Sequence, residues 1–476
     1  MKWISVAVVA VGLPIGCAQV VKERGHDQVD ALVQQRSHFK TRWEKGPPDD
    51  ARIASWVTQL SAGGLTRGKA VEIALVNNHE LQSTYEELGI AQADMVQAGL
   101  LRNPAFGVNY GFATTTGAVS EVSFSLTQDF LDLFILPLRK EIAREQFEAD
   151  TLRVTHQVMQ TVADVEKAFV AAQASSELVA FRRTVVETTQ AAADLSERQF
   201  EAGNVSTLDR STERATFEQA KLDLARAEFE LLESRERINR LLGLWGEATT
   251  WKLAEKLPEI PATEPKLEHL ESLAIRQRFD VAAARRQAVL LAKAVGLARS
   301  SRLFGRIEIG VDAHRDPDGP RVIGPHLVID LPIFDQRQAF IARLEAQQRQ
   351  QERRLSGLAI EVRSDVRLAD ARLRGSRQTA LHYRDVLLPL RKEVVEQAGL
   401  HYNGMFISLY QLLVAKQAEV EARRGYLESV RDYWSARADL AHAVGGGLPT
   451  AAPNHDSKVG KTPPAAKPQG THQHGQ

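Results

Sequence analysis

The chain contains a stretch, from Leu138 to Ala202, that lacks both proline and glycine. A helix of this length would extend roughly 100 Å, because each residue adds about 1.5 Å. A second stretch, from Gln336 to Asn403, is interrupted only by Pro389 and three glycines. Helices of globular proteins seldom exceed about 25 residues unless they belong to coiled coils or repeats. The sequence therefore predicts an elongated, mainly helical protein.

Apolar residues recur every seven positions in the segments that follow Gly203 and Gly404. The series are Phe217, Leu224, Leu231 and Ile238; Leu208, Ala215, Leu222 and Phe229; and Leu413, Val420, Leu427, Trp434 and Ala441. Such a repeat stays in contact with a neighbour only if the helices supercoil. Two stripes on one helix predict neighbours on two sides. A simple two-helix structural coiled coil is the alternative.

The two halves of the chain resemble each other. Three pairs of residues lie 201 to 203 positions apart: Asp132 and Asp335, Gly203 and Gly404, and Gly243 and Gly445. A constant separation of this kind is typical of an internal duplication. Chance similarity is the other reading of these three pairs.

Each half also contains two short runs in which apolar and other residues alternate. The apolar positions are Val108, Tyr110 and Phe112, then Val122, Phe124 and Leu126; and Ile307, Ile309 and Val311, then Val322, Leu327, Ile329 and Leu331. Alternation with a turn between the runs predicts a β-hairpin in each half.

Four isolated strands would leave exposed edges that promote aggregation. Strands cross a bilayer only in a closed barrel, and four cannot enclose a conducting pore, so closure requires several copies of the chain. A soluble four-stranded sheet packed on the helices is the alternative.

The only cysteine, Cys17, follows Lys2 and an apolar run from Trp3 to Gly16. This run is shorter than the roughly 20 residues of a membrane-spanning helix, so it is typical of a secretory signal. Residues 13–17, Leu-Pro-Ile-Gly-Cys, resemble the bacterial lipobox, although Pro14 stands where leucine is preferred. This resemblance implies lipidation at Cys17, and Ala18 implies transfer to the outer membrane. An ordinary signal peptide with an incidental cysteine is the alternative.

Charge and motif content exclude several other classes of protein. The chain has 60 basic and 60 acidic residues, which argues against nucleic acid as a partner because phosphate backbones require a basic surplus. No Ser-His-Asp spacing, phosphate-binding loop or clustered acid pair is evident, so we expect no enzyme activity and no cofactor.

The order of signal, helix, hairpin, long helix and turn, followed by its repetition, resembles the TolC-type family of outer-membrane efflux ducts. The resemblance covers about residues 65–445 and is most specific at 70–81, 91–94 and 97–104, the last reading Gln-Ala-Gly-Leu-Leu-Arg-Asn-Pro. It implies a mainly α fold with a small β part, in which duplicated long-helix hairpins form an α-helical tunnel. Four β-strands per protomer would contribute to a transmembrane barrel in a homotrimer.

The function that this resemblance implies is a passive outer-membrane duct, extending into the periplasm, that works with a periplasmic adaptor and an inner-membrane pump. Two alternatives are the adaptor itself and a structural coiled-coil lipoprotein without a pore. Adaptors carry one helical hairpin flanked by β-rich domains, and a poreless coiled coil would leave the amphipathic strands unexplained.

The expected organisation has six segments. They are a lipoprotein signal with lipobox at 1–17, an N-terminal linker with a short helix at 18–64, the first repeat at 65–245, an inter-repeat linker at 246–265, the second repeat at 266–445, and a disordered, proline-rich tail at 446–476.

The turns at Gly203 and Gly404 correspond to the family's periplasmic tips, which dock the adaptor and close the tunnel. We expect a positive φ at both glycines. Asp209 and Arg210 match the region of the first tip where an acidic side chain takes part in closure. A solvent-exposed ion pair between them is the alternative.

The second tip has Tyr410 and Leu413 where family members with acidic gate rings carry aspartate. We therefore expect a gate formed by packing of Phe406, Ile407 and Tyr410 rather than by a second acidic ring.

Two features bear on the exported substrate. The tail holds His455, His472 and His474, and imidazole is a good ligand for copper, nickel or zinc, although chance composition is the alternative. Residues 129–140 resemble ducts associated with copper and heavy-metal resistance. Metal export is therefore favoured over drug export.

Overall fold

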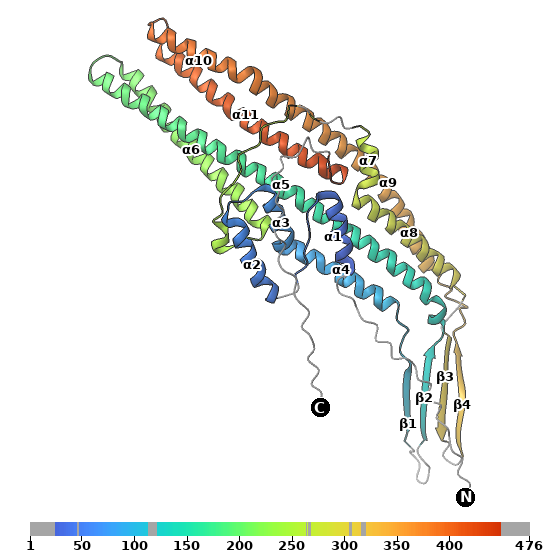
Figure 1. Ribbon diagram of the computed structural model, residues 1–476. Helices are drawn as coiled ribbons and strands as arrows, with labels where there is room; N and C mark the ends of the chain where they lie inside the picture. The colour runs from blue at the N-terminus through green and yellow to red at the C-terminus, as the bar shows by residue number, and fades with distance from the viewer. Residues whose placement is uncertain are drawn as a thin grey trace, which may run out of the picture. The chain divides into compact units, whose positions relative to one another are not determined.

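A computed structural model describes residues 24–44, 47–112, 121–262, 264, 268–303, 307–315 and 320–448. The helices are α1 (Arg24–Ser37), α2 (Pro47–Ala62), α3 (Arg67–Asn77), α4 (His79–Ala98), α5 (Leu131–Glu201), α6 (Thr207–Leu242), α7 (Leu270–Gln277), α8 (Phe279–Ser300), α9 (Gln338–His382), α10 (Leu388–Asn403) and α11 (Leu409–Val444). The strands are β1 (Ala105–Gly111), β2 (Glu121–Asp129), β3 (Ile307–Arg315) and β4 (Arg321–Ile329). The prediction of a mainly helical chain with four strands is confirmed (Figure 1).

The chain forms two compact units. The sheet unit includes Leu88–Phe147 and Val289–Ala346. The hairpin unit includes His26–Glu87, Glu148–Ala288 and the chain from Gln347 onward. No helix among the described residues has both the length and the apolar character of a membrane span.

The four strands form one antiparallel sheet in the order β1-β2-β3-β4, and Figure 1 shows them side by side. Val108 lies opposite Phe124, Leu126 opposite Val311, and Ile309 opposite Leu327. Residues directly opposite share a face of the sheet, because side chains alternate along each strand. Both predicted hairpins are therefore present, and the pairing of β2 with β3 joins them.

The register separates the sheet into two faces of different chemistry. The apolar face carries Phe106, Val108, Tyr110, Val122, Phe124, Leu126, Ile309, Val311, Ile323, Leu327 and Ile329. The polar face carries Asn109, Ser123, Ser125, Thr127, Glu308, Asp312, His314 and His326. Val322 lies opposite His314, on the polar face, whereas Leu327 lies on the apolar face. Ile323, the next residue along β4, lies on the apolar face, because side chains alternate between the two faces of a strand.

The hairpin unit is built from two long antiparallel helix pairs, α5 with α6 and α10 with α11 (Figure 1). Val158, Val165 and Phe169 of α5 are buried. A second cluster joins α9 to α11 and includes Val366 and Tyr433. Of the two seven-residue stripes on α6, the one ending at Ile238 points inward, and that residue is fully buried.

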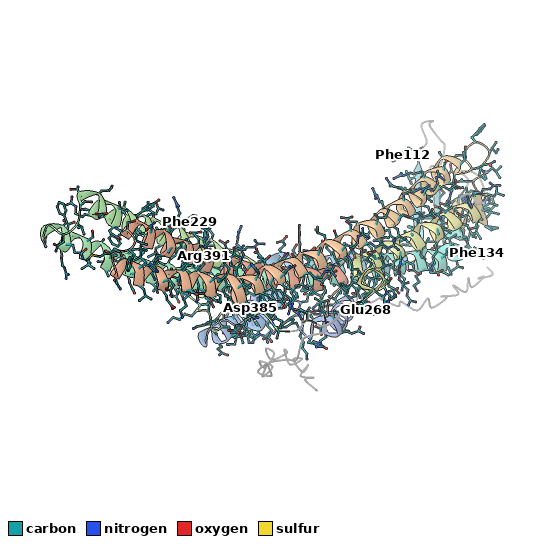
Figure 2. The ribbon with its side chains drawn as sticks, turned by 90° about the horizontal axis from the view of Figure 1, so that it is seen from above. Phe112, Phe134, Phe229, Glu268, Asp385 and Arg391 are labelled. Carbon is teal, nitrogen blue, oxygen red and sulfur yellow. The ribbon has the colours of Figure 1, made fainter. Side chains whose placement is uncertain are left out.

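A π-helical turn at Tyr383–Leu387 interrupts the second long helix, which we had expected to continue from Gln336 to Asn403. Pro389 explains the change, because proline has no N–H and its ring would clash with the carbonyl of Asp385. The Leu388 N–H instead bonds to the Tyr383 carbonyl, which widens the turn. Figure 2 labels Asp385 in this turn and Arg391 in α10, and the helix continues past both.

The segment before the first repeat is more structured than the expected linker with one short helix. It contains both α1 and α2, and Val29 and Val33 of α1 are fully buried. The Trp43 Nε1 atom donates to Glu86 at 2.9 Å, which ties the segment after α1 to α4. A few apolar side chains in a mostly polar stretch were enough to form a packed helix.

Candidate functional site: the two hairpin tips

The candidate site consists of the two turns at the free ends of the helix pairs, both within the hairpin unit (Figure 1). We call residues 202–210 the first tip and residues 404–412 the second tip. The first joins α5 to α6, and the second joins α10 to α11.

The first tip ends α5 through two backbone hydrogen bonds. The Asn204 N–H donates to the Gln199 carbonyl at 2.8 Å, and the Gly203 N–H donates to the Phe200 carbonyl at 2.9 Å. Gly203 has φ +76°, the left-handed conformation that this helix ending requires. A Cβ atom at Gly203 would meet open space, so conformation alone favours glycine here.

The second tip has the same ending with a different residue in the left-handed position. The Phe406 N–H donates to His401 at 2.8 Å and the Met405 N–H to Tyr402 at 2.9 Å. Met405 has φ +60°, whereas Gly404 has φ −80°. The expected positive φ at Gly404 is therefore wrong. A Cβ atom there would lie 2.7 Å from the Phe406 ring, so glycine at 404 permits close approach of that ring.

The equivalence between the tips follows from the residues that begin the next helices. Ser206 caps α6 and forms a capping box with Asp209, and Ser408 caps α11 and forms one with Gln411. Ser206 and Ser408 are 202 positions apart, and so are Asp209 and Gln411. The same separation holds for Gly243 and Gly445, which end these two helices. Gly203 therefore corresponds to Met405, and the sequence-based pairing of Gly203 with Gly404 is shifted by one residue.

The structure gives Asp209 and Arg210 separate partners. The Asp209 carboxylate accepts hydrogen bonds from the Ser206 N–H at 3.2 Å and hydroxyl at 2.6 Å. Arg210 bonds to Glu197 at 3.4 Å, and its guanidinium lies 4.1 Å from the Phe200 ring centre. Among the described residues, no ion pair joins Asp209 to Arg210, so the alternative of a pair between them is not supported.

Large apolar side chains are exposed at both tips of a single chain. Phe406 and Tyr410 are 80% and 67% exposed, and Leu208, which corresponds to Tyr410, is 75% exposed. The His401 ring meets the Phe406 ring edge-on at 5.9 Å. A gate formed by packing of Phe406, Ile407 and Tyr410 stays a prediction.

Arg182 of α5 is a buried cation that sequence reasoning missed. Its guanidinium lies 3.4 Å from Asp223 of α6 and 3.7 Å from Glu421 of α11. One side chain thus links the first helix pair to the second. Its position on α5 gave no signal in the sequence, because charged residues are frequent on helices of this length and the acceptors lie on two other helices.

Two partly buried histidines, His156 of α5 and His442 of α11, lie with their ring centres 5.4 Å apart. Burial, reinforced by the positive charge of nearby groups, lowers the pKa of His442 to about 4. Burial also lowers the pKa of His156. Both rings are therefore uncharged at neutral pH.

Several predicted site residues lie outside the described residues. They are Cys17, the predicted lipidation site, and the tail histidines His455, His472 and His474. In the part of the chain that the structure describes, no three His, Cys, Asp or Glu side chains are grouped so that they could hold a metal ion.

Comparison with known proteins finds a family model and a relative that are similar to this chain. A model of the family described as outer membrane efflux protein matches residues 70–244. The cobalt-zinc-cadmium resistance protein CzcC of Cupriavidus metallidurans is 24% identical over 399 residues, which cover 81% of this chain and 91% of the relative.

Solved structures of outer-membrane channels have a similar fold. The CmeC channel of Campylobacter jejuni matches with a TM-score of 0.70 at 16% identity, over 88% of this chain and 92% of that one. The open state of the MtrE channel of Neisseria gonorrhoeae matches with a TM-score of 0.67 at 19% identity, over 80% and 89%. At this identity the similarity is one of fold.

Proposed function

The chain belongs to the outer membrane efflux protein family, and from this premise we propose that it is the passive outer-membrane duct of a tripartite efflux system. It forms a homotrimer in the outer membrane, extends into the periplasm, and works with a periplasmic adaptor and an inner-membrane pump. A duct supplies a water-filled route whose selectivity depends on its width and lining. No catalytic step is part of this function.

The sheet is the observation that carries the proposal. One face carries most of the large apolar side chains of the sheet, and several of them, such as Phe106 and Leu327, are more than half exposed. The other face is polar, which suits a wall between lipid and water. The outer edges of β1 and β4 are unpaired in the described sheet, so closure in lipid requires further copies of the chain.

The helices offer a matching surface for assembly. The second seven-residue stripe on α6 remains exposed, with 59% exposure at Phe229, which Figure 2 labels. An exposed stripe with this spacing suits a helix of another copy. The two helix pairs of each protomer would then contribute to the tunnel wall.

The tips are proposed to dock the adaptor and to close the tunnel. Gly203 and Gly404 shape the two turns, and the exposed Phe406 and Tyr410 would pack against their counterparts in other protomers. Arg210 would contribute to the gate through its stacked position on Phe200. Asp209, whose carboxylate caps α6, would act mainly by fixing the start of that helix.

The substrates are proposed to be small solutes that include heavy-metal ions. The relative CzcC is described as a cobalt, zinc and cadmium resistance protein, and residues 129–140 resemble metal-resistance ducts, including those for copper. Lipidation at Cys17 and metal binding by His455, His472 and His474 remain predictions.

One experiment separates the duct from its alternatives. We expect the protein, purified from membranes in detergent, to have the native mass of a trimer and to form conducting channels in planar bilayers. A poreless coiled-coil lipoprotein or an adaptor would give no conductance under any condition. A monomer without conductance would overturn the proposal. Deleting the gene and scoring sensitivity to copper, cobalt, zinc and antibiotics would then define the substrate range.

A further inference from the structure

The polar face of the sheet holds a histidine that is oriented by a carboxylate. His326 of β4 and Asp312 of β3 lie diagonally across the strand pair, and the His326 Nδ1 atom is 2.6 Å from an Asp312 oxygen. Gly310 and Gly324, the residues directly opposite them, have no side chains to separate the two groups.

This contact fixes which nitrogen of the ring carries the proton. An ionised carboxylate only accepts hydrogen bonds, so Nδ1 must donate. In the neutral ring the Nε2 atom then keeps its lone pair. Nothing in the described residues bonds to Nε2, and the His326 side chain is 32% exposed.

A carboxylate behind an imidazole is the arrangement that supports metal ligation. Metal-binding histidines usually donate their second N–H to a carboxylate or carbonyl, which fixes the ring and raises the basicity of the ligating nitrogen. Neutral imidazole suits zinc, copper and other divalent transition metals rather than magnesium or calcium. We propose that His326, held by Asp312, is a contact site for divalent transition-metal ions on the polar face of the sheet.

The site is a weak one, and this suits a route for passing ions. The His326–Asp312 pair supplies one oriented imidazole, and the described residues offer no closed set of three ligands. Passage through a channel requires binding that is favourable enough for entry and weak enough for release. The inference rests on the proposed function, since it assigns the polar face to the lumen and gives each trimer three such imidazoles.

The test measures current through the trimer in planar bilayers while Zn²⁺ is added. Each variant is compared with its own metal-free current. We expect Zn²⁺ to reduce the wild-type current. For the same fractional reduction, H326Q should require a Zn²⁺ concentration at least about tenfold higher. D312N should have a smaller effect in the same direction, because an amide orients the ring less strongly.

Two controls use histidines elsewhere in the chain. His314 lies on the same face but already interacts with another group, and His79 begins α4 on the exposed surface. H314Q and H79Q should keep the wild-type Zn²⁺ sensitivity. A loss of sensitivity in H314Q with none in H326Q would overturn the assignment.

A second readout does not depend on conduction. Co²⁺ titrated into the detergent-purified protein should give an absorption change that H326Q weakens and H79Q retains. If the wild type conducts but neither Zn²⁺ nor Co²⁺ distinguishes H326Q, the metal contact is wrong and the duct stands. If no channel conducts yet Co²⁺ binding depends on His326, the duct is wrong and the metal contact stands.

Discussion

Arg182 shows how much a single residue contributes when its charge is buried. Its side chain is 7% exposed and faces Asp223 and Glu421, whereas Arg226 pairs with the same Asp223 from a largely exposed position at 3.6 Å. We expect R182Q to destabilise the protein by about 1 to 3 kcal/mol, because it removes a buried charged group that pairs with acidic residues on two other helices.

The matched variant R226Q should cost less than about 1 kcal/mol, since exposed ion pairs contribute little. Urea unfolding in detergent, followed by helical circular dichroism, measures both. Equal losses for the two variants would show that Arg182 has no special role.

His442 makes the stability of the hairpin unit depend on pH. Its pKa is about 4 in the folded protein, against about 6.5 for an exposed imidazole. Between these pH values the unfolded chain binds more protons than the folded one. The free energy of unfolding is therefore highest above about pH 6.5 and falls as the pH drops toward 4. The loss should approach about 3 kcal/mol at the acidic end.

The free energy of unfolding, measured across this pH range, should fall less steeply with decreasing pH for H442Q than for the wild type. Part of the slope should persist, because burial also lowers the pKa of His156. The variant H382Q, at an exposed position on α9, should keep the full wild-type slope. An unchanged slope in H442Q would exclude this histidine as the cause.

At both tips the first helix of the pair ends in a left-handed residue, but that residue differs between the tips. Substitutions at the two positions should therefore change stability in opposite directions. Met405 occupies the left-handed conformation that glycine adopts at Gly203. M405G should stabilise the second tip by up to about 1 kcal/mol, and G203A should destabilise the first by about 1 to 2 kcal/mol.

Hydrogen exchange at the Phe406 and Asn204 amides, which close the two turns, reports these changes directly. Exchange should slow at Phe406 in M405G and quicken at Asn204 in G203A. Slower exchange in G203A would contradict the role assigned to Gly203.

The elements themselves were largely predictable from sequence, because long helices and amphipathic strands leave periodic patterns. The positive φ at Met405 was not predictable, since a nearby glycine was the natural choice and its actual role, proximity to Phe406, depends on side-chain packing. The π turn was indicated only by Pro389, whose presence does not specify how a helix adjusts. The Arg182 contacts and the His326 contact with Asp312 required the arrangement of separate helices and strands.

At the scale of the whole molecule, adjacent residues of β2 test the two faces of the sheet. Leu126 lies on the apolar face and Ser125 on the polar face. L126R should destabilise the membrane-inserted barrel by about 2 to 4 kcal/mol if it places the charge near the middle of the bilayer. S125R should be tolerated, although it alters conductance.

The amount of trimer in the outer-membrane fraction measures this difference. We expect little trimer for L126R and near wild-type amounts for S125R. If both variants assemble equally well, the apolar face does not contact lipid.

The even number of strands in the described sheet has a consequence for symmetry. Because β1 and β4 run in opposite directions, the β4 of one chain can join the β1 of the next with the same antiparallel hydrogen bonding as inside the chain. Two, three or four copies would therefore satisfy the backbone equally well at every seam. The subunit count must come from curvature and from contacts between helices, and these are the features to alter if a pore of another diameter is wanted.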